Sequence, residues 1–167
     1  MNWRHAIGAA AAAVAIFGAP AGSAPAQTTV KHIQSAASPL ATAVWAGDTL
    51  YVSGQLGSPV TPADPAKGTV AVYGDTKTQA TSAILKIQAI LKEQGLSLGD
   101  VVMMHVYMAG DPEKGGKLDF AGLQAAYTQY FGTAEQPNKP ARAAMQVAAL
   151  AAPWALVEIE VIAVRSK

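Results

Sequence analysis

The sequence predicts a single α+β domain in which two helices cover one face of a mixed β-sheet. The length of 167 residues suits one domain and leaves little room for a second. Two segments carry apolar residues at helical spacing, and five short segments have the apolar pattern of strands. Their order along the chain is strand, strand, helix, strand, helix, strand, strand, which is typical of an α+β layer.

The first 26 residues have the pattern of a cleavable signal peptide rather than of a folded domain. A short basic start precedes an apolar run over residues 6–19, and Ala24 and Ala26 supply the small residues of a cleavage site. A membrane-spanning helix needs about 20 apolar residues, and this run is shorter and soon followed by a proline. We therefore expect cleavage near Ala26, no stable membrane anchor, and a periplasmic or secreted domain formed by residues 27–167.

The first third of that domain predicts two strands and a long loop. Residues 27–39 are polar and form a lead-in segment. Residues 41–45 and 49–53 are expected to be short strands on either side of an Ala-Gly-Asp turn. Residues 54–74 contain three prolines and many turn-forming residues, so we expect a surface loop, with a minor strand at residues 70–72.

Two later segments have the apolar spacing of amphipathic helices. The first begins at Asp75 and ends before Gly95, which suits the position just after a helix. The second runs from about residue 118 to residue 131. In each, one stripe of apolar side chains is expected to be buried. These side chains are Ala80, Ala83, Ile84, Ile87, Ile90 and Leu91 in the first helix, and Phe120, Leu123, Ala126, Tyr127 and Tyr130 in the second.

Three further strands complete the expected sheet. Residues 101–108 are apolar at nearly every position, a pattern that suits a strand buried on both faces. Residues 142–150 and 156–164 are expected to be strands joined by a turn at residues 152–153. Because two helices cover only one face of the sheet, we expect oligomerisation to cover the other.

The alternation of side chains along the last two strands separates an apolar face, expected to meet the helices, from a face with charged or small residues. If the two strands pair, Arg142 and a glutamate both project toward the uncovered side, and an arginine flanked by alanines leaves its guanidinium accessible to a carboxylate. The alternative is an Arg142–Glu158 salt bridge that only settles an oligomer interface. The expected apolar faces carry Ala143, Met145 and Val147 in one strand and Val157, Ile159 and Val161 in the other; the opposite faces carry Arg142, Ala144 and Gln146, and Glu158 and Glu160.

Composition and charge argue against several classes of function. Lysines and arginines number 12 against 11 aspartates and glutamates, and without Arg4 the mature chain is formally neutral, so we expect no nucleic-acid partner. The absence of cysteine excludes disulfides and thiolate catalysis. His5, His32 and His105 lack the spacing of metal ligands, so no metal site is expected.

Five motifs together resemble the Rid/YjgF family, which is also called RidA-like or endoribonuclease L-PSP. The resemblance covers nearly the whole mature chain, in order and spacing. It implies a chorismate-mutase-like α+β fold, assembled as a homotrimer with a site at each subunit interface. The motifs are YVSGQLG at 51–57, GLSLGDVVMMHVYM at 95–108, FAGLQAAYTQYFG at 120–132, PARAAMQVAAL at 140–150 and VEIEVIAV at 157–164.

The resemblance also implies an activity, the hydrolysis of small carboxylate-bearing imines and enamines to a 2-keto acid and ammonia. Arg142 matches the arginine that grips the substrate carboxylate, and Glu158 matches the glutamate that positions the attacking water. Such a hydrolysis needs orientation and charge balance rather than a metal or an organic cofactor, so none is expected. The alternative is a non-catalytic binder of small carboxylates, or a chaperone-like holdase, of the same fold.

Further substrate contacts follow from the same resemblance. Ser53 and Gly54 match a serine and a glycine that contact the substrate; from the residues alone, Ser53-Gly54 at a strand end also offers a hydroxyl and backbone N–H groups to an anion. Ala144 matches a backbone contact. Gln124 stands where the family's deaminases have an asparagine, and Leu40 stands where they have a tyrosine, which suggests a different or more apolar substrate.

Overall fold

The computed structural model describes residues 28–166, so the expected signal peptide lies outside the described residues. Within this range, no helix has the length and apolar character needed to span a bilayer. The described chain forms a sheet and two α-helices. The strands are β1 (Val30–Ile33), β2 (Ala43–Ala46), β3 (Thr49–Leu56), β4 (Val101–Met108), β5 (Ala141–Gln146) and β6 (Val157–Val164), and the helices are α1 (Thr76–Glu93) and α2 (Phe120–Tyr127).

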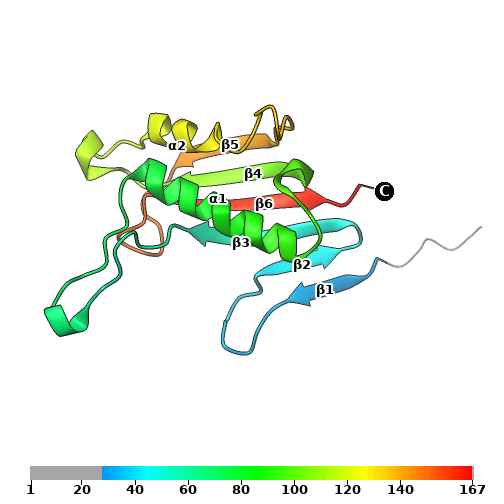
Figure 1. Ribbon diagram of the computed structural model, residues 1–167, viewed down its shortest axis with the longest axis horizontal. Coiled ribbons are helices and arrows are strands. Elements are labelled where there is room, and N and C mark those ends of the chain that lie inside the picture. Colours follow the sequence, from blue (N-terminus) through cyan, green and yellow to red (C-terminus); the bar gives the residue numbers. More distant parts are fainter. Residues whose placement is uncertain (1–27, 167) are drawn as a thin grey trace, which may run out of the picture.

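The six strands form one mixed sheet in the order β1-β2-β3-β6-β4-β5. Neighbouring strands are antiparallel, except that β4 and β5 are parallel. Both helices lie on the same side of the sheet, where α1 crosses β3 and β6 and also contacts α2 (Figure 1). The predicted α+β class, with two helices on one face, is therefore confirmed.

The ends of α1 follow from its sequence. Asp75 is the N-cap, because its carboxylate accepts a hydrogen bond of 2.9 Å from the backbone N–H of Thr78. Hydrogen bonding from the Thr78 side chain, and next from this backbone N–H, holds the pKa of Asp75 below its usual value. At the other end, Gly95 has a φ of 74°, a left-handed conformation that favours glycine and closes the helix. The helix therefore has the bounds that the sequence predicts.

The hydrophobic core lies between the helices and the sheet. Its members come from one face of each element, as the alternation along the strands requires. Fully burying one such side chain stabilises the fold by about 1.5–3 kcal/mol. The largest side chains with almost no exposed surface are Leu50, Ile84, Ile87, Leu91, Met104, Met108, Leu123 and Ile159.

Several boundaries differ from the sequence-based prediction. The lead-in segment forms an edge strand, β1, whose residues Val30, Lys31 and His32 are all exposed, so it carries no apolar alternation by which to find it. Strand β3 continues to Leu56, and the expected strand at residues 70–72 is reduced to an isolated bridge between Thr61 and Val72. Helix α2 ends early, because the chain tightens into turns after Tyr127.

The last two strands do not pair with each other, so the condition under which Arg142 and a glutamate share the uncovered side is not met. Strand β6 lies between β3 and β4, whereas β5 lies at the sheet edge and pairs in parallel with β4. A helix, α2, connects β4 to β5, and such a crossover produces a parallel pair. The register places Arg142 opposite the buried Met104, so Arg142 and Ala144 lie on the face that the helices cover, not on the open one.

The second face of the sheet is open in one chain. Strand β4 is buried on its helix side only, which corrects the expectation of a strand buried on both faces. Large apolar side chains from three strands are exposed: Tyr51 (49%), Val102 (48%) and Met145 (44%). We name these three residues the open-face patch. An apolar sheet face of this kind is suited to contact with another chain.

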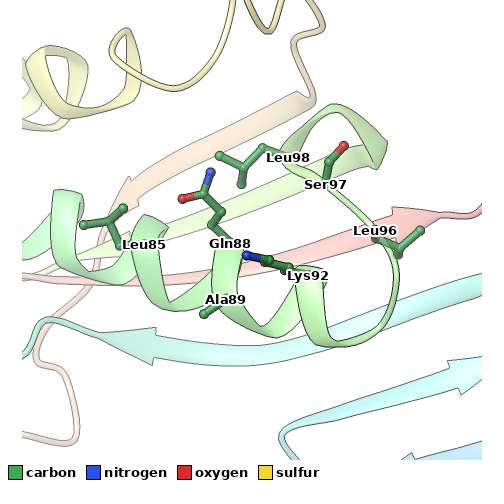
Figure 2. A pocket seen from close by; sticks show the side chains of 7 residues that line it. All are labelled: Leu85, Gln88, Ala89, Lys92, Leu96, Ser97 and Leu98. Atoms are coloured by element: carbon green, nitrogen blue, oxygen red, sulfur yellow. The ribbon is translucent and has the colours of Figure 1, made fainter.

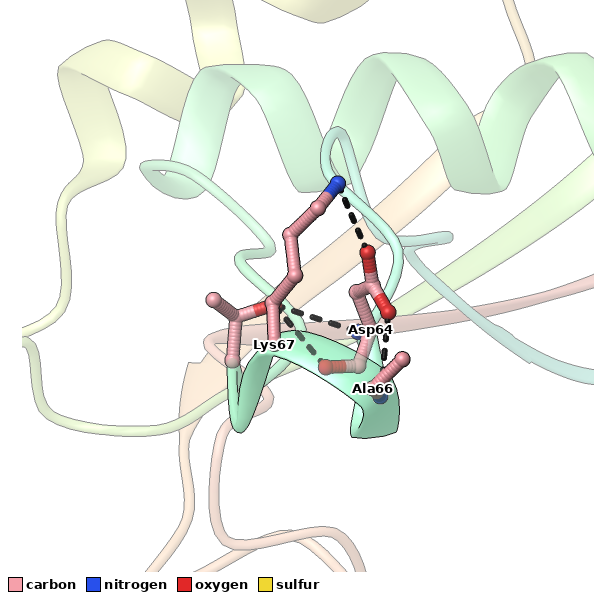
Figure 3. A network of polar contacts seen from close by, with 4 residues as sticks. Asp64, Ala66 and Lys67 are labelled. Atoms are coloured by element: carbon pink, nitrogen blue, oxygen red, sulfur yellow. Dashed lines mark hydrogen bonds and ion pairs between the residues drawn. The ribbon is translucent and has the colours of Figure 1, made fainter.

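The segment between β3 and α1 extends away from the sheet as an arm (Figure 1). Bridges between Thr61 and Val72 and between Asp64 and Thr69 hold its two sides together. Near the bend, Asp64 accepts a hydrogen bond from the backbone N–H of Ala66 and forms a 2.9 Å ion pair with Lys67 (Figure 3). Lys67 is well exposed and Asp64 is partly exposed, so this pair contributes little to stability.

Candidate functional site

Arg142 lies on the edge strand β5 and its guanidinium is held by α2. Its Nη2 donates a 2.8 Å hydrogen bond to the Oε1 atom of Gln124. Its Cζ atom lies 4.3 Å from the centre of the Tyr127 ring and 5.8 Å from that of Phe120. The guanidinium therefore has one hydrogen-bond partner and an aromatic face beneath it.

The Nη1 atom of Arg142 is buried and has no hydrogen-bond partner, and it is the only such side-chain atom within residues 28–166. A buried donor without a partner costs about 1–3 kcal/mol, and more when the group is charged. Buried polar atoms of this kind call for a functional explanation. A planar carboxylate matches the donor fork of a guanidinium and satisfies this atom.

Ala144 lies two residues further along β5 and on the same face as Arg142, opposite Val106 of β4. It packs against the edge of the hydrophobic core. Its small side chain leaves the strand backbone next to Arg142 uncrowded. We call Arg142, Gln124 and Ala144 the arginine half of the candidate site.

Glu158 lies on β6 with its side chain on the open face, because its neighbours Val157 and Ile159 are completely buried on the helix side. It faces the bulge that interrupts β3 between Val52 and Gln55. A Cβ atom at Gly54 would collide with the Glu158 carboxylate. Glycine is therefore required at position 54 for the carboxylate to lie over the bulge.

Ser53 completes this second group but differs from the expectation that it offers free donors. Its hydroxyl donates a 2.6 Å hydrogen bond to the carbonyl of Ala41, and its backbone N–H donates to the carbonyl of Thr42. Both donors are thus used inside the protein, and only the oxygen of the hydroxyl remains as an acceptor. We call Glu158, Ser53 and Gly54 the glutamate half.

A polar network that the sequence does not reveal lies beside the glutamate half. The Oε1 atom of Glu160 accepts a 3.1 Å hydrogen bond from the hydroxyl of Tyr107 and lies 3.0 Å from Nδ1 of His105. The hydrogen bond to Glu160 raises the pKa of Tyr107, with smaller contributions from desolvation and from the charges of Glu160 and Glu158. The open face of the sheet therefore carries charged and polar side chains in addition to the apolar open-face patch.

One chain does not bring the two halves together. Strand β4 separates the strands that carry Arg142 and Glu158, and the two side chains leave the sheet on opposite faces. Two strand spacings alone amount to about 10 Å. Within the described chain, Arg142 pairs with Gln124 and not with Glu158, so the alternative of a direct salt bridge is not realised in a single copy.

Three surface grooves lie elsewhere. The first, of about 460 Å³, runs between the outer side of α1 and the segment after it, and Figure 2 shows its lining residues from Leu85 to Leu98. The second lies next to Tyr73 and Trp154, whose rings stack, and the third next to Trp45 and Arg165. None of the three is lined by a residue of either half.

Comparison with known proteins identifies the family. The family profile described as "Endoribonuclease L-PSP" matches residues 29–165, which is nearly the whole described chain. The chain belongs to this family, the YjgF/RidA family. The predicted membership is thereby confirmed.

Several YjgF/RidA relatives match most of the chain. A "2-iminobutanoate/2-iminopropanoate deaminase" of Capra hircus is 40% identical over 131 residues, which are 78% of this chain and 83% of the relative. A RutC family protein of Pyrococcus horikoshii is 38% identical over 125 residues, 75% and 86% of the two chains. The crystal structure of E. coli TdcF with bound serine has a TM-score of 0.60 at 32% identity and covers 81% of this chain and 99% of that one.

Within the YjgF/RidA chain described here, the sequence points to both halves but misses the aromatic surroundings of Arg142. Tyr127 and Phe120 appear in the sequence only as part of an apolar helical stripe. Their spacing of seven residues from one another, with Gln124 between them, places all three on one side of α2. The spacing of these three residues was the sequence signal from which the aromatic surroundings of Arg142 could have been predicted.

Proposed function

We propose that this protein is a hydrolase of the imine and enamine deaminase type, acting on small 2-imino acids. Water adds to the imine carbon, the carbon–nitrogen bond breaks, and ammonia and a 2-keto acid are released. The observation that carries the proposal is the buried, unpartnered Nη1 atom of Arg142. The deaminase name of the mammalian relatives supports the same reaction.

In this proposal Arg142 binds the substrate carboxylate. The Nη1 atom and the remaining N–H of Nη2 form a fork that donates hydrogen bonds to two carboxylate oxygens side by side. Gln124 keeps Nη2 in place through its 2.8 Å hydrogen bond. The contact gives the substrate a fixed position, which is the main requirement for a reaction that is intrinsically easy.

Glu158 has the role of orienting and activating the water. A carboxylate accepts hydrogen bonds from water, and it withdraws the proton as the oxygen–carbon bond forms. This proton passes to the imine nitrogen, and the second proton of the water follows it from the hydroxyl group as the carbonyl forms and the carbon–nitrogen bond breaks, so atoms and charge balance without a cofactor. The required glycine at position 54 leaves the space over the bulge to this carboxylate.

The complete site is formed between two copies of the chain in an assembly that we propose to be a homotrimer. Two observations support this arrangement: Arg142 and Glu158 lie on opposite faces of the sheet, and the open-face patch exposes apolar area from three strands. If the edge strand β5 of one copy lies against the open face of the next, the arginine half of the first meets the glutamate half of the second. A trimer repeats this contact three times.

The activity is tested by measuring ammonia release from 2-imino acids that an amino-acid oxidase generates in the same vessel. We expect the wild-type protein to accelerate release, and Arg142→Ala to lose at least about a hundredfold in kcat/KM, because a charged hydrogen-bonded pair disappears. Lys67→Ala, which removes an exposed cation from the arm, is the matched control. Equal rates for wild type and Arg142→Ala exclude the proposed catalytic role.

The shared site is tested by mixing two inactive variants, Arg142→Ala and Glu158→Gln. Random mixing in a trimer places an intact arginine half against an intact glutamate half at about one interface in four. Co-refolded variants should therefore recover about a quarter of the wild-type activity, while each variant alone stays inactive. If mixing recovers no activity although mixed trimers form, both residues of a working site belong to one copy.

Binding without turnover is the second candidate function. It is favoured by the relative of known structure, E. coli TdcF, that holds serine, a small carboxylate-bearing molecule. A binder is stabilised by 2-oxobutanoate in a thermal-unfolding experiment but releases no ammonia above the uncatalysed rate. Turnover by the wild-type protein decides in favour of the hydrolase.

We propose further that the domain acts outside the cytoplasm after removal of residues 1–26. The apolar run and the small residues near Ala26 support this, and the family match begins shortly after the expected cleavage point. Mass spectrometry of protein expressed from the full sequence in a bacterial host tests it. An intact N-terminus in the cytoplasmic fraction would contradict export.

A further inference from the structure

Three residues of α2 surround the guanidinium of Arg142. Phe120, Gln124 and Tyr127 follow one another at four and three residues, so they form one stripe along the helix. Gln124 accepts the hydrogen bond of Nη2, and both rings lie within 6 Å of Cζ, a distance at which a cation and an aromatic face attract each other. The helix therefore determines where the arginine lies.

Tyr127 is the ring that is fixed in place. Its side chain is only 7% exposed, and it stacks on the buried Phe131 with ring centres 4.9 Å apart and an interplanar angle of 15°. Phe120, in contrast, is 49% exposed and lies further from Arg142. Of the two rings, Tyr127 is thus the one that can hold the plane of the guanidinium.

The contact between Tyr127 and Arg142 is one between a cation and a neutral ring. Burial raises the pKa of the Tyr127 hydroxyl, and the positive charge of Arg142 opposes this rise only in part. The phenol is therefore protonated throughout the physiological range. Its negative ring face, rather than a phenolate, attracts the guanidinium.

These contacts leave a ligand one direction from which to approach the Arg142 guanidinium. The guanidinium carbon lies over the Tyr127 ring, Gln124 occupies an N–H of Nη2, and Nη1 has no partner. A ligand carboxylate reaches Nη1 in the plane of the guanidinium. In a 2-imino acid the C=N group is conjugated with the carboxylate and lies in the same plane, so the plane of Arg142 sets the plane of the reacting carbon.

We propose that Tyr127 is a positioning residue, which holds the Arg142 guanidinium so that planar 2-imino and 2-keto acids bind coplanar with it and expose one face of the reacting carbon to the water. The inference rests on the proposed function of Arg142 and adds the determinant of substrate orientation. It also predicts a preference for planar acids over amino acids, whose tetrahedral Cα cannot align with the carboxylate in this way.

The first test compares Tyr127→Leu, Tyr127→Phe and Phe131→Leu. Tyr127→Leu removes the ring and is expected to raise KM about two- to thirtyfold, with a smaller change in kcat. Tyr127→Phe restores a ring and is expected to recover most of this loss. Phe131→Leu loosens the stack behind Tyr127 but leaves the Tyr127 ring over Arg142, so it should lower the Tm and raise KM less than Tyr127→Leu does. An unchanged KM in Tyr127→Leu overturns the inference, as does an equal rise in Phe131→Leu.

A second test keeps the shape of the ring. Phenylalanines with one, two and three fluorines are incorporated at position 127, which weakens the negative ring face step by step. KM is expected to rise with each fluorine; a KM independent of fluorination overturns the inference. This series does not depend on whether Tyr127→Leu folds.

A ligand-free measurement separates this inference from the proposed activity. In ¹⁵N-arginine-labelled protein, the guanidinium protons of Arg142 should be shifted upfield by the Tyr127 ring, and this shift should disappear in Tyr127→Leu. An absent shift excludes the stacked geometry whatever the activity. If the shift is present but the wild-type protein neither releases ammonia nor binds 2-oxobutanoate, the proposed function fails while the placement of Arg142 by Tyr127 stands.

Discussion

Arg142 and Glu158 lie on opposite faces of one sheet, with strand β4 between the strands that carry them. Each side chain is nevertheless held in a defined environment, Arg142 by Gln124 and Glu158 over Gly54. Because these two halves cannot meet within one chain, we propose that a neighbouring copy completes the site.

Assembly should depend on the open-face patch. Met145→Glu places a charge on an apolar face that we expect a second copy to cover, and burial of an unpaired charge is costly. The variant is expected to sediment as a monomer and to lose activity. Val70→Glu introduces the same charge on the arm, where Val70 is already 80% exposed, and should remain an active oligomer. A trimeric Met145→Glu protein would place the interface elsewhere.

Substitution of Gly54 should affect catalysis more than stability. In Gly54→Ala the new methyl group meets the Glu158 carboxylate, which can move aside because it ends a flexible side chain. We expect kcat/KM to fall at least about tenfold and the Tm to change little. In a Glu158→Ala background, Gly54→Ala should cause no further loss, because both changes act on the same carboxylate. Additive losses in this double-mutant cycle would contradict the explanation.

Tyr107 should titrate at higher pH than an ordinary tyrosine. Its pKa is raised chiefly by the hydrogen bond to Glu160, so Glu160→Gln, which removes the charge of the acceptor, is expected to bring it back toward 10.0. A group whose pKa is raised on folding contributes its stability below the unfolded pKa and loses it as the pH rises through the folded pKa. The window therefore lies above pH 10.0. Difference absorbance of wild type against Tyr107→Phe measures the titration; an identical curve in Glu160→Gln would rule out this cause.

Loss of the N-cap of α1 should destabilise the domain. Asp75→Ala is expected to reduce the free energy of unfolding by about 1 kcal/mol, measured by urea denaturation at neutral pH. Because the folded pKa of Asp75 is lowered, its contribution is present above the usual value of 3.8 and is lost as the pH falls through the folded pKa. Asp75→Asn keeps a capping oxygen and should lose less stability. Equal stabilities of Asp75→Ala and wild type at neutral pH would show that the cap contributes nothing.

The sequence predicts the elements of the fold well where burial is one-sided and strong. The apolar period of α1 and the capping residue Asp75 define that helix, and the apolar run at residues 101–108 matches β4 residue for residue. Strand β1 escapes prediction because its side chains are exposed at the sheet edge and need no apolar pattern. A local apolar pattern therefore reveals an element because one face of that element contacts the hydrophobic core.

The sequence does not predict which strands pair, because strand pairing depends on the connections between elements rather than on a local pattern. The alternation along β5 correctly groups Arg142 with Ala144, but it contains no information on which group faces the helices. That choice follows from the crossover through α2, which makes β5 the parallel neighbour of β4. Small alanine side chains on both sides of β5 leave either orientation compatible with the sequence.

Helix α2 contributes to folding and to recognition at once. Leu123 and Ala126 are wholly enclosed in the interior, while Gln124 and Tyr127, their immediate neighbours, hold the arginine. A change of ligand preference is therefore hard to obtain by substitutions in α2, since most of them also weaken the packing of the hydrophobic core. Substitutions that change the ligand preference among related chains should instead concentrate in exposed segments outside α2, such as the stretch around Leu40. The Leu40 side chain is exposed, so its replacement does not weaken the core.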